Sequence, residues 1–278
     1  MDAVRERYPE HFQRLGPQRL PMIAVATAML VLLLYGMQVL GFFDGKLLSG
    51  MGRLVEIAGL MLPPDPGSWA HARAYGMALI ETVAIALLGT LSAAILALPV
   101  GLLAARNVTA QRIVRFLARR SLDTIRSVDI LIWALIWINV VGLGPFAGAL
   151  AIMTSDIGSF GKLFSEAIEA ADRKPVEGIA SAGGSHFMGI RFGILPEVFP
   201  VLASQVLYYF ESNTRSATII GIVGAGGIGL HLAEAIRTLE LQQTSFIILM
   251  ILVTVAAIDL VSSQLRFAMI GRRGGVSA

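Results

Sequence analysis

Long apolar runs without charge dominate the chain. The runs at 22–43 and 82–105 contain no charged residue, and each is long enough to cross a bilayer as an α-helix that satisfies its own backbone hydrogen bonds. A further run at 241–267 carries Asp259 and reaches Arg266. This pattern predicts an all-α polytopic membrane protein.

The middle of the chain needs a turn to complete its spans. An apolar stretch at 130–155 is interrupted by Gly-Leu-Gly-Pro at 142–145, which is typical of a tight turn between helices. The third span is then expected to begin near residue 122 and carry Asp129, and the fourth to end near residue 170 and carry Asp156 and Lys162. A fifth span from residue 194 leads into a glycine-rich element, so we expect about six transmembrane helices.

Composition and charge support a membrane protein. Of the 278 residues, 55% are hydrophobic and 15% are charged, and there is no cysteine, which leaves no room for a sizeable soluble domain and excludes disulfides and thiolate metal sites. The net charge of +3 resides in short segments between apolar runs, so we interpret it as membrane orientation rather than nucleic-acid binding. The positive-inside rule predicts that both termini are cytoplasmic, in a bacterial inner membrane.

These observations divide the chain into five parts. The polar start precedes an apolar run too long for a cleavable signal, so that run is expected to remain as a span. The expected parts are a cytoplasmic tail at 1–21, a first transmembrane helix at 22–43, a periplasmic loop at 44–76, a transmembrane core at 77–268 and a cytoplasmic tail at 269–278.

A polar, glycine-rich segment separates the fourth and fifth spans. It reads PVEGIASAGGSHFMGIRFGILP at 175–196 and resembles the cytoplasmic EAA loop of binding-protein-dependent ABC permeases. Glu177, Gly183, Leu195 and Pro196 fall at the spacing of that pattern, whereas Gly178 stands where its first alanine is expected. An ordinary polar loop is the alternative interpretation. The resemblance implies a cytoplasmic coupling helix at 175–190 that meets the ATPase through Glu177, Gly178, Ser181, Gly183, Leu195 and Pro196.

A second glycine-rich motif follows the fifth span. The sequence VGAGGIG at 223–229 contains G-x-G-x-x-G, but a dinucleotide site also needs a βαβ unit and a suitably placed acid, and neither is indicated here. We expect an unwound or half-helical element lining a watery path, whose glycine amides could hold an anion. Close helix packing by small residues is an equally good interpretation.

The neighbouring residues carry a more specific resemblance. The runs YFESNTRSA at 209–217, GIVGAGGIG at 221–229 and AIR at 235–237, with EAIEA at 166–170 upstream, look like the permease subunit of phosphonate ABC importers. The resemblance covers about residues 75–267. It implies the methionine-importer-like fold of type I importer permeases and transport of phosphonate or a related oxyanion such as phosphite or hypophosphite by alternating access.

The resemblance also implies partners. They are two ATPase subunits, a periplasmic substrate-binding protein and a second permease copy, identical or paralogous, within the lipid membrane. The chain shows no G-x-x-x-x-G-K-[ST] motif, so we expect no enzyme activity or cofactor here and place ATP and magnesium in the partner ATPase.

Several residues are candidates for the translocation path. Arg215 could bind oxyanion oxygens bidentately, or it could pair with Glu211 one helical turn earlier. Asn213 and Ser216 could donate to an oxyanion or join helices to one another. The full set is Glu211, Asn213, Arg215, Ser216, Gly224, Gly226 and Gly227.

The alternatives rest on intramembrane acids. Asp129, Asp156 and Asp259 could form a proton relay in a proton-coupled secondary transporter of a small anion, although helix ends and interhelical pairing explain them better. A membrane enzyme is disfavoured because no paired acid and base are indicated. His71, His186 and His231 lack metal-ligand spacing, so no metal is expected. The identity of the oxyanion and of the second permease copy stays open.

Overall fold

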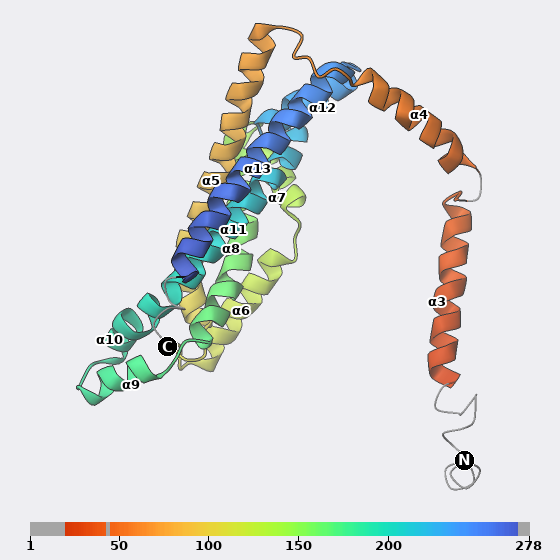
Figure 1. The fold of residues 1–278 in the computed structure, drawn as a ribbon. Helices are drawn as coiled ribbons and strands as arrows, with labels where there is room; N and C mark the ends of the chain where they lie inside the picture. Colours follow the sequence, from red (N-terminus) through yellow and green to blue (C-terminus); the bar gives the residue numbers. More distant parts are fainter. Residues whose placement is uncertain (1–19, 43–44, 272–278) are drawn as a thin grey trace. The chain divides into compact units, whose positions relative to one another are not determined.

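The computed structural model describes residues 20–42 and 45–271 and divides into two units, one ending at Leu60 and the next beginning at Met61. Every regular element among the described residues is a helix (Figure 1), which confirms the predicted all-α class. The predicted tails at 1–21 and 269–278 lie almost wholly outside the described residues. The two units are described in turn.

The described part of the first unit, residues 20–42 and 45–60, contains two helices. Helix α3 (Leu20–Val39) corresponds to the predicted first span, and its side chains are mostly exposed and apolar on all sides, as expected for a helix surrounded by lipid. Helix α4 (Lys46–Leu60) lies where the sequence analysis predicts a loop at 44–76. That prediction is wrong for α4, because Pro63, Pro64 and Pro66 come after the helix and do not interrupt it.

The second unit begins with its longest helix. Helix α5 (Trp69–Ala104) has 36 residues, and the side chain of its N-cap, Ser68, accepts a hydrogen bond from the backbone N–H of His71. At 1.5 Å per residue the helix is roughly 54 Å long, well beyond the ~30 Å of a hydrocarbon core. It therefore starts thirteen residues before the predicted span at 82–105.

The predicted third span is broken rather than straight. Helices α6 (Arg112–Arg126) and α7 (Ile130–Val141) meet at an angle of 87°. Asp129 lies at the break, where its carboxylate accepts a hydrogen bond of 2.8 Å from the N–H of Leu131 and caps α7. The predicted third span carries Asp129, and the structure agrees with the preferred assignment of this carboxylate to a helix end.

Helix α8 (Pro145–Glu169) occupies the centre of the bundle and packs most extensively against α5, with α6, α7 and α11 also around it. Small residues allow the close approach: a Cβ on Gly89 would lie 2.7 Å from Ile152, and one on Gly158 would lie 2.7 Å from the backbone nitrogen of Arg126. Because protein surrounds it, α8 tolerates Asp156 and Lys162 within its length.

The chain then turns back through the bundle. Helices α9 (Lys174–Ser181) and α10 (His186–Met188) and the π-helix η1 (Gly189–Ile194) lead into α11 (Leu195–Ile222). Helix α12 (Ile228–Arg237) follows the glycine-rich motif, and α13 (Leu241–Gly271) ends the described chain. By length and apolarity, four described helices qualify as membrane spans, or five if α6 and α7 form one; α8, the predicted fourth crossing, is too polar to qualify.

The packing at Gly158 generates a stability prediction. Gly158→Ala places a Cβ against the backbone of α6. We therefore expect the free energy of unfolding to fall by about 1–3 kcal/mol, measured by thermal unfolding of the purified protein in detergent. Gly76→Ala is the matched control, since no heavy atom lies within 4 Å of its Cβ and alanine favours a helix by up to about 1 kcal/mol. Equal unfolding temperatures for the two variants would contradict the proposed packing.

Candidate functional site

The predicted coupling region projects from one end of the second unit. Helices α9 and α10 lie at the end where α8 stops and α11 starts, far from α12 (Figure 1). The predicted single helix at 175–190 is wrong, because a turn divides it. The N–H of Gly183 donates to the carbonyl of Ala180, and the N–H of Gly184 donates to the carbonyl of Ile179, which is the Schellman end of a helix. Gly183 has a φ of +81°, a conformation that favours glycine.

One face of α9 packs and the other is free. Val176 and Ile179 contact η1, where a Cβ on Gly193 would lie 3.0 Å from Val176. The predicted coupling residues Glu177, Gly178, Ser181 and Gly183 are all exposed on α9 and its turn, whereas Leu195 and Pro196 begin α11. The backbone approaches closely at Gly193, whereas a Cβ on Gly178 would meet nothing within 4 Å.

Exposed aromatic residues extend this surface. Phe187 and Phe192 are 68% and 62% exposed, and the guanidinium of Arg191 lies 5.3 Å from the Phe192 ring centroid. Large apolar side chains exposed beside charged ones commonly mark a protein contact surface. The sequence analysis missed them, because two phenylalanines in a glycine-rich stretch do not show from sequence alone that they face outward.

Two contacts tie this segment to the bundle. A ring nitrogen of His186 lies 3.0 Å from the carbonyl oxygen of Val108 in the α5–α6 connection. The N–H of Asp172 donates a 2.9 Å hydrogen bond to Glu197, in the first turn of α11. Displacement of the segment would therefore reach both α11 and the end of α5.

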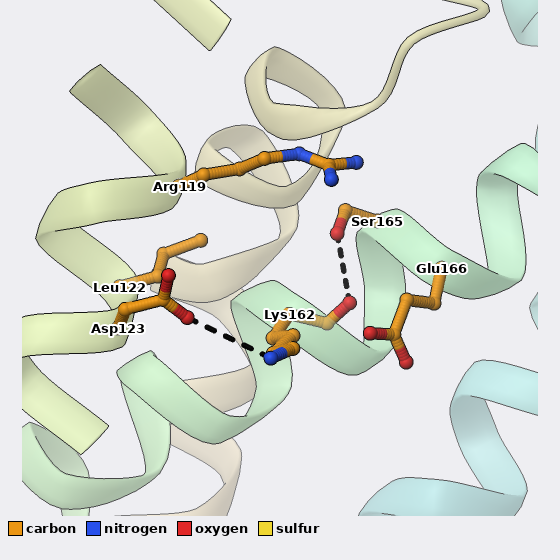
Figure 2. Close-up of a pocket in the computed structure, with 6 residues that line it drawn as sticks. All are labelled: Arg119, Leu122, Asp123, Lys162, Ser165 and Glu166. Carbon is orange, nitrogen blue, oxygen red and sulfur yellow. Dashed lines mark hydrogen bonds and ion pairs between the residues drawn. The ribbon is translucent and has the colours of Figure 1, made fainter. Parts of the chain in front are cut away.

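A charged cluster joins the helix ends beside the coupling segment (Figure 2). Arg119 of α6 donates to the carbonyl of Ala104 at the end of α5 and forms an ion pair with Glu169 at the end of α8. Lys162 pairs with Asp123 at 3.7 Å. A cavity of about 80 Å³ lies among Arg119, Leu122, Asp123, Lys162, Ser165 and Glu166. These contacts clamp three helices together.

The glycine-rich motif is a turn between α11 and α12. Gly224, Gly226 and Gly227 have positive φ angles, which confirms the expected break in the helix. The N–H of Gly227 donates to Glu81 at 2.9 Å, and the N–H of Ile228 donates to Thr82 at 2.8 Å. These two amides are thus occupied by α5, and close packing describes this turn better than an anion site.

Asn213 joins three helices in the core. Its amide nitrogen donates to the hydroxyl of Thr90 at 2.8 Å and to the carboxyl of Asp156, and all three side chains are buried. The stitching interpretation of Asn213 is confirmed, and Asp156 is an interhelical partner. Ser216 donates only within α11, to the carbonyl of Ser212.

A second intramembrane cluster lies between α11 and α13. Arg215 pairs with Glu211 at 3.2 Å, which confirms the expected ion pair one turn apart. Arg266 also pairs with Glu211, at 3.3 Å, and lies 3.8 Å from Asp259. The sequence analysis treated Arg266 as a charge at the end of the chain and did not connect it with Glu211. Among the described residues, no three His, Asp or Glu side chains are placed to hold a metal ion.

The family described as binding-protein-dependent transport system inner membrane component matches residues 97–272, more than half of the chain. The chain belongs to this family. The permease is therefore a transport subunit rather than an enzyme, in a family whose members work with separate ATPase and substrate-binding components. Membership supports this function over a proton-coupled secondary transporter.

Two relatives come from Stutzerimonas stutzeri. The permease is 38% identical over 223 residues to the putative phosphite transport system permease protein HtxC, which covers 80% of this chain and 78% of the relative. It is 37% identical over 227 residues to the phosphite transport system permease protein PtxC, covering 81% of this chain and 82% of the relative.

A solved structure confirms the fold. The structure titled "Inward facing conformations of the MetNI methionine ABC transporter" superposes with a TM-score of 0.64 at 18% identity, covering 73% of this chain and 99% of that chain. The permease thus has the expected fold of methionine-importer-like ABC permeases.

The Asn213 network generates a second prediction. Asn213→Leu removes the amide that donates to Thr90 and to Asp156. Thr90 keeps its own bond to the carbonyl of Ala86, whereas the buried Asp156 carboxyl loses its donor, which costs about 1–3 kcal/mol. We expect a lower thermal unfolding temperature in detergent. Ser216→Ala is the control, since Ser216 bonds only to its own helix, and an unfolding temperature for Asn213→Leu equal to that of the control would rule out a stabilising network.

Proposed function

We propose that this permease translocates phosphonate or a related reduced-phosphorus oxyanion, such as phosphite or hypophosphite, across the bacterial inner membrane. The observation that carries the proposal is the similarity to two phosphite transport permeases over about four fifths of the chain. Two arginines within apolar helices, Arg215 and Arg266, supply the charge that such an anion needs.

The proposed assembly has three kinds of partner. Two ATPase subunits dock on the coupling segments of two permease copies, which are identical or paralogous, and a periplasmic binding protein delivers the anion at the opposite end. ATP and magnesium bind in the ATPase subunits, and this chain holds no cofactor. The exposed face of α9, with Phe187 and Phe192 beside it, supports a docking surface there.

We place the coupling segment and both termini in the cytoplasm. Arg112, Arg115, Arg119, Arg120 and Arg126 lie on α6, which meets the end of α8 that leads to α9. An arginine-rich helix at this end supports its cytoplasmic side by the positive-inside rule.

The attachment of α9 to η1 and α11 provides a route for the movement that alternating access requires. Movement of α9 by the ATPase is transmitted through Val176 and Ile179 to η1, and from η1 directly into α11. Because α11 carries Arg215 and leads into the turn at Gly224, the same movement changes the surroundings of the anion along the path. ATP binding and hydrolysis in the partner thereby open the two sides in turn.

ATP hydrolysis tests the substrate. The complex reconstituted with its ATPase and binding protein should hydrolyse ATP several-fold faster when the binding protein carries one of phosphonate, phosphite, hypophosphite or phosphate, because only a loaded binding protein completes the cycle. The stimulating anion is the substrate. Failure of the ATPase to assemble with the permease, together with uptake driven by a proton gradient alone, would overturn the proposal.

Replacement of Gly183 tests the coupling segment. Gly183→Val places a branched side chain at φ +81°, where it is strained, so the end of α9 should rearrange. We expect assembled complexes that hydrolyse ATP but import poorly. Gly178→Ala, in the same helix with open space around it, should retain import, and normal import by Gly183→Val would count against the coupling role of this turn.

A further inference from the structure

Glu211 bridges two arginines that come from different helices. One carboxylate oxygen, Oε1, lies 3.2 Å from Arg215 on α11, and the other, Oε2, lies 3.3 Å from both terminal nitrogens of Arg266 on α13. The Glu211 side chain is only 10% exposed. An anionic group with two oxygens thus already occupies the space between the two guanidinium groups.

This bridge has longer contacts than the Arg119–Glu169 pair, whose side chains are 34% and 24% exposed. Charge-assisted N–H···O bonds are usually about 2.7–2.9 Å long, and the Arg119–Glu169 pair at 2.5 Å is shorter still, with the backbone N–H of Arg106 as a further donor to Glu169. The Glu211 contacts are longer by 0.7 Å or more. Glu169 joins helix ends through short contacts, whereas the longer contacts of Glu211 suit a partner that can be exchanged.

Both arginines retain capacity for another ligand. Glu211 is the one hydrogen-bond partner that the described residues offer Arg215, whose side chain is 50% exposed, so most of its five N–H donors are available. Arg266 stays near Asp259, at 3.8 Å, and over the Tyr208 ring, at 5.9 Å. It would keep its position if Glu211 moved away.

The half-exposed guanidinium of Arg215 cannot face lipid cheaply. Both arginines lie within apolar spans, His186–Ile222 and Leu241–Met269, and charges in such spans face protein or water rather than hydrocarbon. The surface of α11 that carries Arg215 is therefore expected to face a watery path, or the space between subunits, rather than lipid.

We propose that Arg215 and Arg266 form an oxyanion site in the translocation path and that Glu211 is a resident counter-ion displaced by the transported anion. The inference rests on the proposed function, and it adds Arg266 and a role for Glu211. A phosphorus oxyanion presents one oxygen to each guanidinium, as the carboxylate does. Glu211, together with Asp259 beside Arg266, balances the charge of the two arginines in the empty site. Glu211 also weakens anion binding, as rapid release requires.

The test measures binding of phosphite and of methylphosphonate to the purified permease–ATPase complex without binding protein. Glu211→Gln keeps the size of the side chain but removes its charge, so the dissociation constant should fall about tenfold or more, while turnover in the reconstituted system slows. The double variant Glu211→Gln with Arg266→Gln should not show this lower dissociation constant. Arg237→Gln, at the exposed end of α12, is the control and should not change binding.

A second variant keeps the proposal testable if Glu211→Gln does not assemble with the ATPase. Arg266→Lys keeps the charge but loses the forked donor geometry, and it should raise the KM for import by several-fold with ATPase assembly intact. An unchanged dissociation constant in Glu211→Gln, or an unchanged KM in Arg266→Lys, overturns the site. If either of these results is obtained while the substrate still stimulates ATP hydrolysis normally, the oxyanion site is rejected and the importer function is retained. If Glu211→Gln binds the anion more tightly but the loaded binding protein does not stimulate ATP hydrolysis, the importer function is rejected and the site is retained.

Discussion

Alanines and glycines line the face where α5 and α8 meet, and the close approach of the two backbones holds α8 at the centre of the bundle. Small residues favour such contacts in membranes because they allow close van der Waals packing. There is no hydrophobic driving force between helices that are already surrounded by lipid. With α8 enclosed by neighbours, Asp156 is buried among them and is shielded from hydrocarbon. The central position of α8 also brings Asp156 within reach of Asn213 on α11.

The two ends of the core are built differently. Beside the coupling segment, Arg119 joins the ends of α5 and α8, and the segment itself is attached through His186 and Glu197. Toward α12, the turn at Gly227 is held to α5 by Glu81 and Thr82. Helix α11 connects both ends, so a displacement at α9 can reach the glycine turn without unfolding the bundle.

Two arginine and glutamate contacts with the same chemistry have different uses because their surroundings differ. Glu169 accepts from a side chain and a backbone N–H at the end of a helix, which fixes its position. Glu211 lies between two guanidinium groups within apolar spans, at longer distances and beside a half-exposed arginine. The first arrangement stabilises the bundle, and the second is suited to exchange with a diffusing anion.

The sequence by itself determined the class, most of the spans and the family resemblance, because uncharged runs and motif spacing are local properties of the chain. It also predicted the Glu211–Arg215 pair, since residues four apart share a helix face. The bend before α7 was not predictable, because Asp129 suits both a span interior and a helix cap. The division of the predicted coupling helix into two was not predictable either, because it depends on Schellman hydrogen bonds at Gly183. Only the tertiary structure brought Arg266 to Glu211 and Asp156 to Asn213, since 55 and 57 residues separate those partners and helix packing alone decides which faces meet.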